Sequence, residues 1–160
     1  ANPAKALALR VADRVPLLWG LDPVAVAVGE HAAHAFAAHA ATVCDVEDYR
    51  QALARPALRR AAQSGGAERD IFADPDDSSG DIPTRLLLLS VRTGPATDAA
   101  RYQAEDLLPG ADVIVPAEEI EADEIVRAAV LALRFELAAV YLGLAAGSIG
   151  GAGRFAPATA

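Results

Sequence analysis

The chain has 160 residues and a mass of 16.5 kDa, which is the size of one domain. Hydrophobic residues make up 53% of it and charged residues 22%, so it can bury a core and is not a wholly disordered protein. The net charge of −8 opposes nucleic-acid phosphates and anionic lipids, and we expect neither nucleic acid nor a membrane as a partner. Cys44 is the single cysteine, which excludes an internal disulfide and predicts a reducing, cytoplasmic location.

The sequence contains no methionine, even at position 1, and we expect it to be part of a longer protein. No signal peptide is predicted, because the sequence has no positively charged start followed by an apolar run. The longest apolar stretch, 125–146, carries Arg127, Arg134 and Glu136, each costly in a bilayer, so it is interpreted as a buried helix. Abundant Ala, Arg and Gly with little Lys resembles the coding bias of a GC-rich bacterium.

Short apolar runs alternate with alanine-rich helical segments along the chain. Asn2 and Asp22 mark helix starts, because each is a capping residue followed by proline. The expected helices are 2–14, 22–40, 47–63 with a break at Pro56, 97–108 and 118–147. The expected strands are 15–20, 41–46, 85–91 and 112–116, with a loop at 64–83 and a flexible tail at 148–160.

This alternation predicts an α/β fold, a three-layer α-β-α sandwich with a mostly parallel sheet of flavodoxin-like or Rossmann-like type. One domain is expected over 1–147, and any ligand is expected outside the carboxyl ends of the strands. Trp19, at a strand end, is expected in the core. The other predicted core residues are Leu17, Leu18, Val43, Leu87, Leu89, Val113, Val115, Ile125, Leu133, Leu137 and Tyr141.

Three histidines, His31, His34 and His39, are the one unusual cluster, with Glu30 beside them. On a helix, His31 and His34 share a face, which makes them candidates for ligand binding. The alternative is a partly exposed helical face without a ligand. No metal site is predicted, because the order of residues is not that of a zinc peptidase and no second acidic cluster accompanies it. Phosphate-loop, dinucleotide and esterase motifs are absent, and no cofactor is predicted.

Arg127 and Arg134 lie seven residues apart on one face of the last helix. Ion pairs with Glu124 or Glu136 are the expected arrangement, and binding of a phosphorylated ligand by Arg127 is the alternative. Cys44 is expected to pack as a small apolar group on a buried strand, because a nucleophile would need a basic neighbour.

Four segments taken together resemble the C-terminal half of bacterial bifunctional phosphoglucose/phosphomannose isomerases, which contain two sugar-isomerase (SIS) domains. The segments are the opening Asn2–Ala8, the strand Val15–Gly20, the strand Leu86–Val91 and the helical Ala139–Leu144. The resemblance covers nearly the whole chain and is nearest to divergent TobH-like relatives. It implies a missing N-terminal SIS domain and a phosphosugar ligand.

The family interconverts aldose and ketose phosphates by ring opening at a histidine and proton transfer through a glutamate. The family's Asn-Glu-Asn and Glu-Leu-Asn-His-Asn-Glu stretches correspond here to Ala35–His39 and Glu47–Ala52, and neither motif is kept. Only Glu47 and His39 remain as weak catalytic candidates. The resemblance therefore implies a sugar-phosphate-binding domain without catalysis. The alternatives are an active isomerase when joined to its other domain, or a purely structural half.

We also expect the chain to form a homodimer through an alanine-rich helical surface. The expected contributors are the helix 24–40, with His31, His34 and Phe36, and the end of the long helix near Val140 and Leu144. The alternative is that alanine only packs these helices onto their own sheet.

Overall fold

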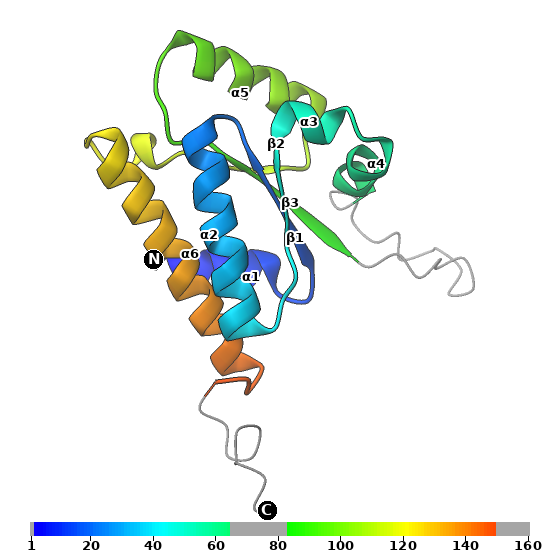
Figure 1. Cartoon of the computed structure of the whole chain (residues 1–160), viewed down its shortest axis with the longest axis vertical. Coiled ribbons are helices and arrows are strands. Elements are labelled where there is room, and N and C mark those ends of the chain that lie inside the picture. Colours follow the sequence, from blue (N-terminus) through cyan, green and yellow to red (C-terminus); the bar gives the residue numbers. More distant parts are fainter. Residues whose placement is uncertain (1, 65–82, 150–160) are drawn as a thin grey trace, which may run out of the picture.

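The computed structural model describes residues 2–64 and 83–149 (Figure 1). Its α-helices are α1 Pro3–Val11, α2 Pro23–Ala40, α3 Tyr49–Leu53, α4 Pro56–Ser64, α5 Pro95–Leu107 and α6 Glu124–Ala145, with a short 3-10 helix, η2, at Pro116–Glu118. Its strands are β1 Val15–Gly20, β2 Asp45–Asp48, β3 Thr84–Leu89 and β4 Asp112–Ile114.

The four strands form one sheet in the order β2-β1-β3-β4, and every neighbouring pair is parallel. Helices cover both faces of this sheet (Figure 1). The predicted α/β three-layer sandwich with a parallel sheet is therefore confirmed.

Side chains along β1 and β3 alternate between the two faces of the sheet, as the pleat of a strand requires. Leu18, Leu87 and Leu89 belong to the cluster shared with α1, α2 and α6. Trp19 and Leu88 belong to the cluster shared with α3, α4 and α5, and both are fully buried. A strand that is apolar on both faces is typical of a central parallel strand, which is why these runs were recognisable in the sequence.

Local capping determines where most helices begin. Asn2 accepts hydrogen bonds from the amides of Ala4 and Lys5 at the start of α1. Asp22 caps α2 in the same way, so both predicted starts are confirmed. The predicted break at Pro56 is also confirmed, because the chain leaves α3 before it and enters α4 at Pro56 itself.

The strand predicted at 41–46 lies further along the chain, at Asp45–Asp48. Ala41 ends α2 in a left-handed conformation, with φ of 51°, and Thr42–Cys44 form the connection. Val43 is 76% exposed and is not a core residue, so that prediction was wrong. Cys44 precedes the strand and is half-buried against the α2 cluster.

The face that α6 buries was predicted wrongly. Of the expected core residues, Ile125 is 79% exposed and Leu133 58% exposed, and Leu137 and Tyr141 are also exposed. The side chains that α6 buries are Leu131, Phe135, Ala138 and Ala139. Small residues on this face let α6 approach α2 closely. Phe36 of α2, expected on an outer surface, is fully buried and meets Phe135 edge-on with ring centroids 6.1 Å apart.

Val113 and Val115 are only partly buried, because β4 is the edge strand. The predicted loop 64–83 falls almost wholly outside the described residues. In the predicted tail, Ser148 and Ile149 are described, and Ser148 donates its hydroxyl to the carbonyl of His39 at 2.9 Å. The rest of that tail also lies outside the described residues.

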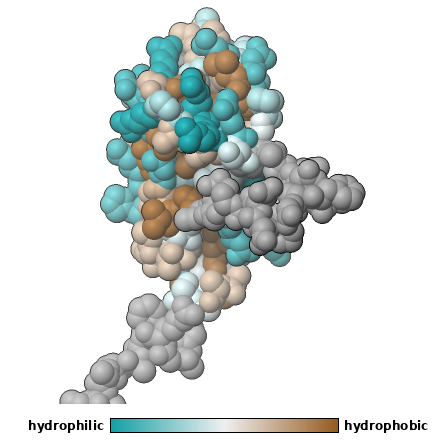
Figure 2. Space-filling view, turned by 90° about the vertical axis from the view of Figure 1, so that its right-hand side faces the viewer, coloured by the Kyte–Doolittle hydropathy of each residue, from teal (hydrophilic) through white to brown (hydrophobic). Residues whose placement is uncertain are grey.

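Figure 2 shows a largely hydrophilic side of the molecule with small separate apolar areas. Helix α6, which carries several exposed apolar residues, lies on the other side of the fold, along the outer edge in Figure 1. Among the described helices, α6 is long and apolar enough to cross a membrane by length and composition alone. Its inner face, however, is packed on α2 through Phe135.

Candidate functional site at the switch point of the sheet

In the described sheet, the order of the strands changes direction between β1 and β3. From β1 the chain proceeds to β2 on one side, whereas β3 lies on the other side of β1. In open parallel sheets, ligands bind at the carboxyl ends of the strands at such a switch point. Here that position is formed by Leu21 and Asp22 after β1 and by Ser90, Val91 and Arg92 after β3.

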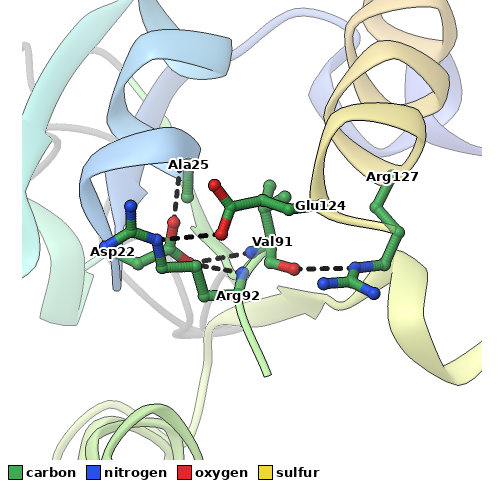
Figure 3. A network of polar contacts seen from close by, with 6 residues as sticks. All are labelled: Asp22, Ala25, Val91, Arg92, Glu124 and Arg127. Carbon is green, nitrogen blue, oxygen red and sulfur yellow. Dashed lines mark hydrogen bonds and ion pairs between the residues drawn. The ribbon is translucent and has the colours of Figure 1, made fainter. Parts of the chain in front are cut away.

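Asp22 joins the two strand ends. Its side chain is almost fully buried, and one carboxylate oxygen accepts from the amide of Ala25 at 2.9 Å, which caps α2. The other oxygen accepts from the amides of Val91 at 2.8 Å and Arg92 at 3.1 Å (Figure 3). One carboxylate therefore satisfies three backbone donors and fixes the segment after β3 against the start of α2.

Arg127 of α6 holds the same segment from the other side. Its Nε donates to the carbonyl of Val91 at 3.0 Å (Figure 3). Its Nη1 donates to the carbonyl of Ala122. The expected pairing of Arg127 with Glu124 or Glu136 does not occur. Glu124 instead pairs with Arg92, whose Nε lies 3.0 Å from its carboxylate.

The residues that follow Val91 form a polar surface next to this hydrogen-bonded backbone. The side chain of Arg92 is 47% exposed, and Thr93 beside it is exposed as well. Gly94, immediately before α5, has a φ of 127°, a conformation that L side chains rarely adopt, and no side chain caps the helix there. Helix α5 follows Arg92 and Thr93 directly in the chain, and the start of a helix carries a positive partial charge that suits a small anion. Pro95, its first residue, supplies no amide, and Asp98 places a carboxylate in the first turn.

The three histidines lie on α2, away from this site. His31 and His39 both contact Glu136 of α6, at 2.9 and 3.3 Å between Nε2 and a carboxylate oxygen. His34 instead bonds to the carbonyl of Glu30 at 2.8 Å. The structure therefore brings His31 together with His39, not with His34. Their shared partner is Glu136, which sequence analysis had assigned to the arginines of the last helix.

Glu47 and His39 are not brought together. Glu47 lies in β2, opposite Trp19, where it forms an ion pair with Arg55 and accepts from the amide of Asp48 at 3.1 Å. His39 lies in the last turn of α2, before the chain returns to β2. The two weak catalytic candidates are therefore at different ends of the sheet.

Arg134 also departs from the expected pairing. It forms a bidentate ion pair with Glu119, in which Nη1 and Nη2 donate to the two carboxylate oxygens at 2.8 and 2.7 Å. Both residues line an open groove of about 220 Å³ between α1, β4 and α6. These two charges are paired with each other, as Arg92 and Glu124 are at the switch point. Among the described residues, no group of three or more His, Cys, Asp or Glu is placed to hold a metal ion.

The half-buried Cys44 gives a prediction about reactivity. Burial raises the pKa of its thiol to about 12, so the thiol stays protonated at pH 8. We expect alkylation at pH 8 to be roughly a thousandfold slower in the folded protein than in urea, because only the thiolate reacts. Timed mass spectrometry at this single cysteine measures both rates, and equal rates would contradict the burial.

Comparison with known proteins gives a likeness in fold. A scan against known protein families finds no match, and neither does a search of curated proteins. Among solved structures, the crystal structure of a glucose-6-phosphate isomerase like protein from Thermus thermophilus matches with a TM-score of 0.54 and 18% identity. The match covers 91% of this chain and 42% of that chain, so this chain spans less than half the length of its structural neighbour. Over most of its length this chain therefore has a fold like that of the glucose-6-phosphate isomerase like protein.

Proposed function

We propose that this chain is a sugar-phosphate-binding domain of the sugar-isomerase type that does not isomerise its ligand by itself. The observation that carries the proposal is the polar surface at the switch point, which is formed by Arg92, Thr93 and the start of α5. The backbone beneath it is held in place by the hydrogen bonds of Asp22 and Arg127. The phosphate of the ligand would lie there, with its sugar over the carboxyl ends of β1 and β3. The fold likeness to a glucose-6-phosphate isomerase like protein adds support.

The carboxylates near this surface argue against catalysis. Isomerisation needs a base that can reach the substrate carbon and an acid that opens the ring. Asp22 is buried with both oxygens bound to backbone amides, and Glu124 is paired with Arg92. All three histidines lie on α2, and none lies in its first turn, which is the part of the helix next to this surface. Two of them contact Glu136 instead. Binding without turnover is therefore the better-supported function.

A direct test is calorimetric titration of the chain with glucose 6-phosphate, mannose 6-phosphate and glucosamine 6-phosphate, alongside the free sugars and inorganic phosphate. Arg92→Gln is expected to weaken binding of the phosphorylated sugars about tenfold, because it removes one charge-assisted contact. Arg59→Gln, at an exposed arginine on α4, is the matched control and should bind as the wild type does. No binding by the wild type, or equal effects of both variants, would contradict the proposal.

The active-isomerase alternative has its own test. A coupled assay of aldose and ketose interconversion should show no turnover by this chain. Turnover that Glu47→Gln or His39→Ala abolishes would instead establish catalysis by those residues. We further propose that the chain works in the cytoplasm as one part of a larger protein, in which a second SIS domain completes the sugar site.

A further inference from the structure

The ion pair between Arg92 and Glu124 lies at the proposed phosphate site and differs from the pair that Arg134 makes with Glu119. Nε of Arg92 donates to one carboxylate oxygen at 3.0 Å, and the two side chains are 47% and 43% exposed. In the described part of the chain, neither terminal nitrogen of this guanidinium has a hydrogen-bond acceptor. Arg134, in contrast, binds Glu119 with two nitrogens and is only 10% exposed. The Arg92 pair is therefore the weaker of the two and is accessible to solvent.

The backbone around Arg92 is fixed, whereas its side chain is held by this one contact. Asp22 accepts from the amides of Val91 and Arg92, and Arg127 donates to the carbonyl of Val91 (Figure 3). These bonds hold the end of β3 whichever partner the guanidinium has. A change of side-chain rotamer is therefore sufficient to transfer the guanidinium from the Glu124 carboxylate to a ligand.

We propose that Glu124 binds the guanidinium of Arg92 in the free chain as a competitor of the ligand, and that the phosphate group of the ligand displaces it. This inference rests on the proposed function and adds a regulating residue to the same site. Arginine recognises carboxylates and phosphates alike, through charge-assisted hydrogen bonds. A phosphate monoester carries a charge of about −1.5 to −2 at pH 7 and three acceptor oxygens. It can therefore replace a singly charged carboxylate that is held by one bond.

Release of Glu124 costs the fold little. The residue begins α6 directly after its cap, Asp123, and a negative charge in the first turn of a helix is stabilised without a partner. An exposed ion pair also contributes little to stability. Because the Glu124 side chain is already 43% exposed, water can hydrate the released carboxylate. The pair therefore lowers the affinity for the ligand without closing the site.

The same competition defines the class of ligand. A sugar acid offers Arg92 the group that Glu124 already supplies, with the same charge. Glu124 is tethered beside the guanidinium, and a tethered group acts as if it were present at a roughly millimolar concentration. An external carboxylate therefore gains nothing by the exchange. We expect the site to accept phosphate monoesters and to exclude sugar acids.

Calorimetric titration with glucose 6-phosphate tests the competition. Glu124→Gln keeps the size of the side chain but removes its charge, and it should bind about threefold more tightly than the wild type. Glu121→Gln is the matched control, because it removes the same charge from the same connection. Glu121 is exposed and makes no described hydrogen bond or ion pair, so its variant should bind as the wild type does. Inorganic phosphate should show the same gain with Glu124→Gln.

The gain in affinity must depend on Arg92. In an Arg92→Gln background, Glu124→Gln should no longer raise the affinity, because no guanidinium remains to be released. A gain that persists in this background, or an equal gain with Glu121→Gln, would mean that only the total charge matters and would overturn the inference. Glucuronate should not bind the wild type measurably. Equal affinities for glucuronate and glucose 6-phosphate would overturn the inference as well.

Carbon-13 spectra of the carboxyl groups follow the displacement directly in the wild type. The Cδ resonance of Glu124 should move on saturation with glucose 6-phosphate. That of Glu119 should stay in place, because its two bonds to Arg134 are kept. A Glu124 resonance that does not move while the ligand saturates the chain would overturn the displacement.

Failure of this inference and failure of the proposed function give different results. Binding that Arg92→Gln weakens, but that Glu124→Gln leaves as in the wild type, would overturn the competition and keep the phosphate site. No binding of any phosphate compound by the wild type and by Glu124→Gln would overturn both.

Discussion

Replacing Asp22 by alanine is expected to lower the free energy of unfolding by about 3 kcal/mol. Loss of the α2 cap contributes about 1 kcal/mol. The amides of Val91 and Arg92 then lose their only described acceptor, and a buried donor without a partner costs about 1 to 3 kcal/mol. Because the Arg92 amide is only part-buried, water can replace some of its bond.

Urea unfolding followed by circular dichroism measures this loss, and Asp123→Ala is the matched control. Asp123 caps α6 by accepting from the amide of Val126 at 2.9 Å, but it is exposed and bridges no second segment. Its removal should therefore cost only about 1 kcal/mol. Equal losses in the two variants would mean that the bridge from Asp22 to the segment after β3 contributes nothing to stability.

Asp22→Asn separates charge from shape at the same position. The amide side chain keeps one acceptor oxygen but presents an NH2 group where a second acceptor is needed. Either the cap to Ala25 or the bonds to Val91 and Arg92 are then lost, with a cost of about 2 kcal/mol. A loss below that of Asp123→Ala would contradict this account.

Local signals in the sequence were sufficient for much of the fold. The strand Val15–Gly20 is buried on both faces, so its short apolar run bounded by glycine was informative. Asn2 and Asp22 precede proline at helix starts, and capping depends on neighbouring residues only. The alternation of such elements leads to the parallel sheet.

The orientation of α6 could not be read from the sequence in the same way. The helix has an apolar stripe on two opposite sides, one containing Leu131 and Phe135 and the other Leu133 and Leu137. Periodicity alone does not say which of them faces the sheet. Packing decides it: the side with Ala138 and Ala139 permits the close approach to α2.

The candidate site was predictable only in part. The carboxyl edge of the sheet follows from the α/β pattern, and Asp22 was identified there as a helix cap. Its bonds to Val91 and Arg92 join residues about seventy positions apart, which no local pattern encodes. The same holds for Glu136, which meets His31 and His39 only because α2 and α6 lie side by side.

That contact between α2 and α6 leads to the second large expected effect, at Gly143. Gly143→Ala should destabilise the fold by about 2 to 3 kcal/mol. A Cβ there would lie 2.0 Å from the carbonyl oxygen of His39, which is backbone and cannot rotate away. The end of α2 must move from α6, and Ser148 then loses its bond of 2.9 Å to that carbonyl.

The sign of the effect makes the experiment decisive. Helix propensity alone favours alanine over glycine by about 1 kcal/mol, so without the close approach Gly143→Ala would stabilise the protein. Ala129→Gly, at an exposed position of the same helix, calibrates that propensity and should cost about 1 kcal/mol. Urea unfolding of both variants gives the two values. If Gly143→Ala proved as stable as the wild type or more so, the contact between α6 and His39 would be looser than the structure has it. The partnership of Glu136 with the two histidines would then lose its structural basis too.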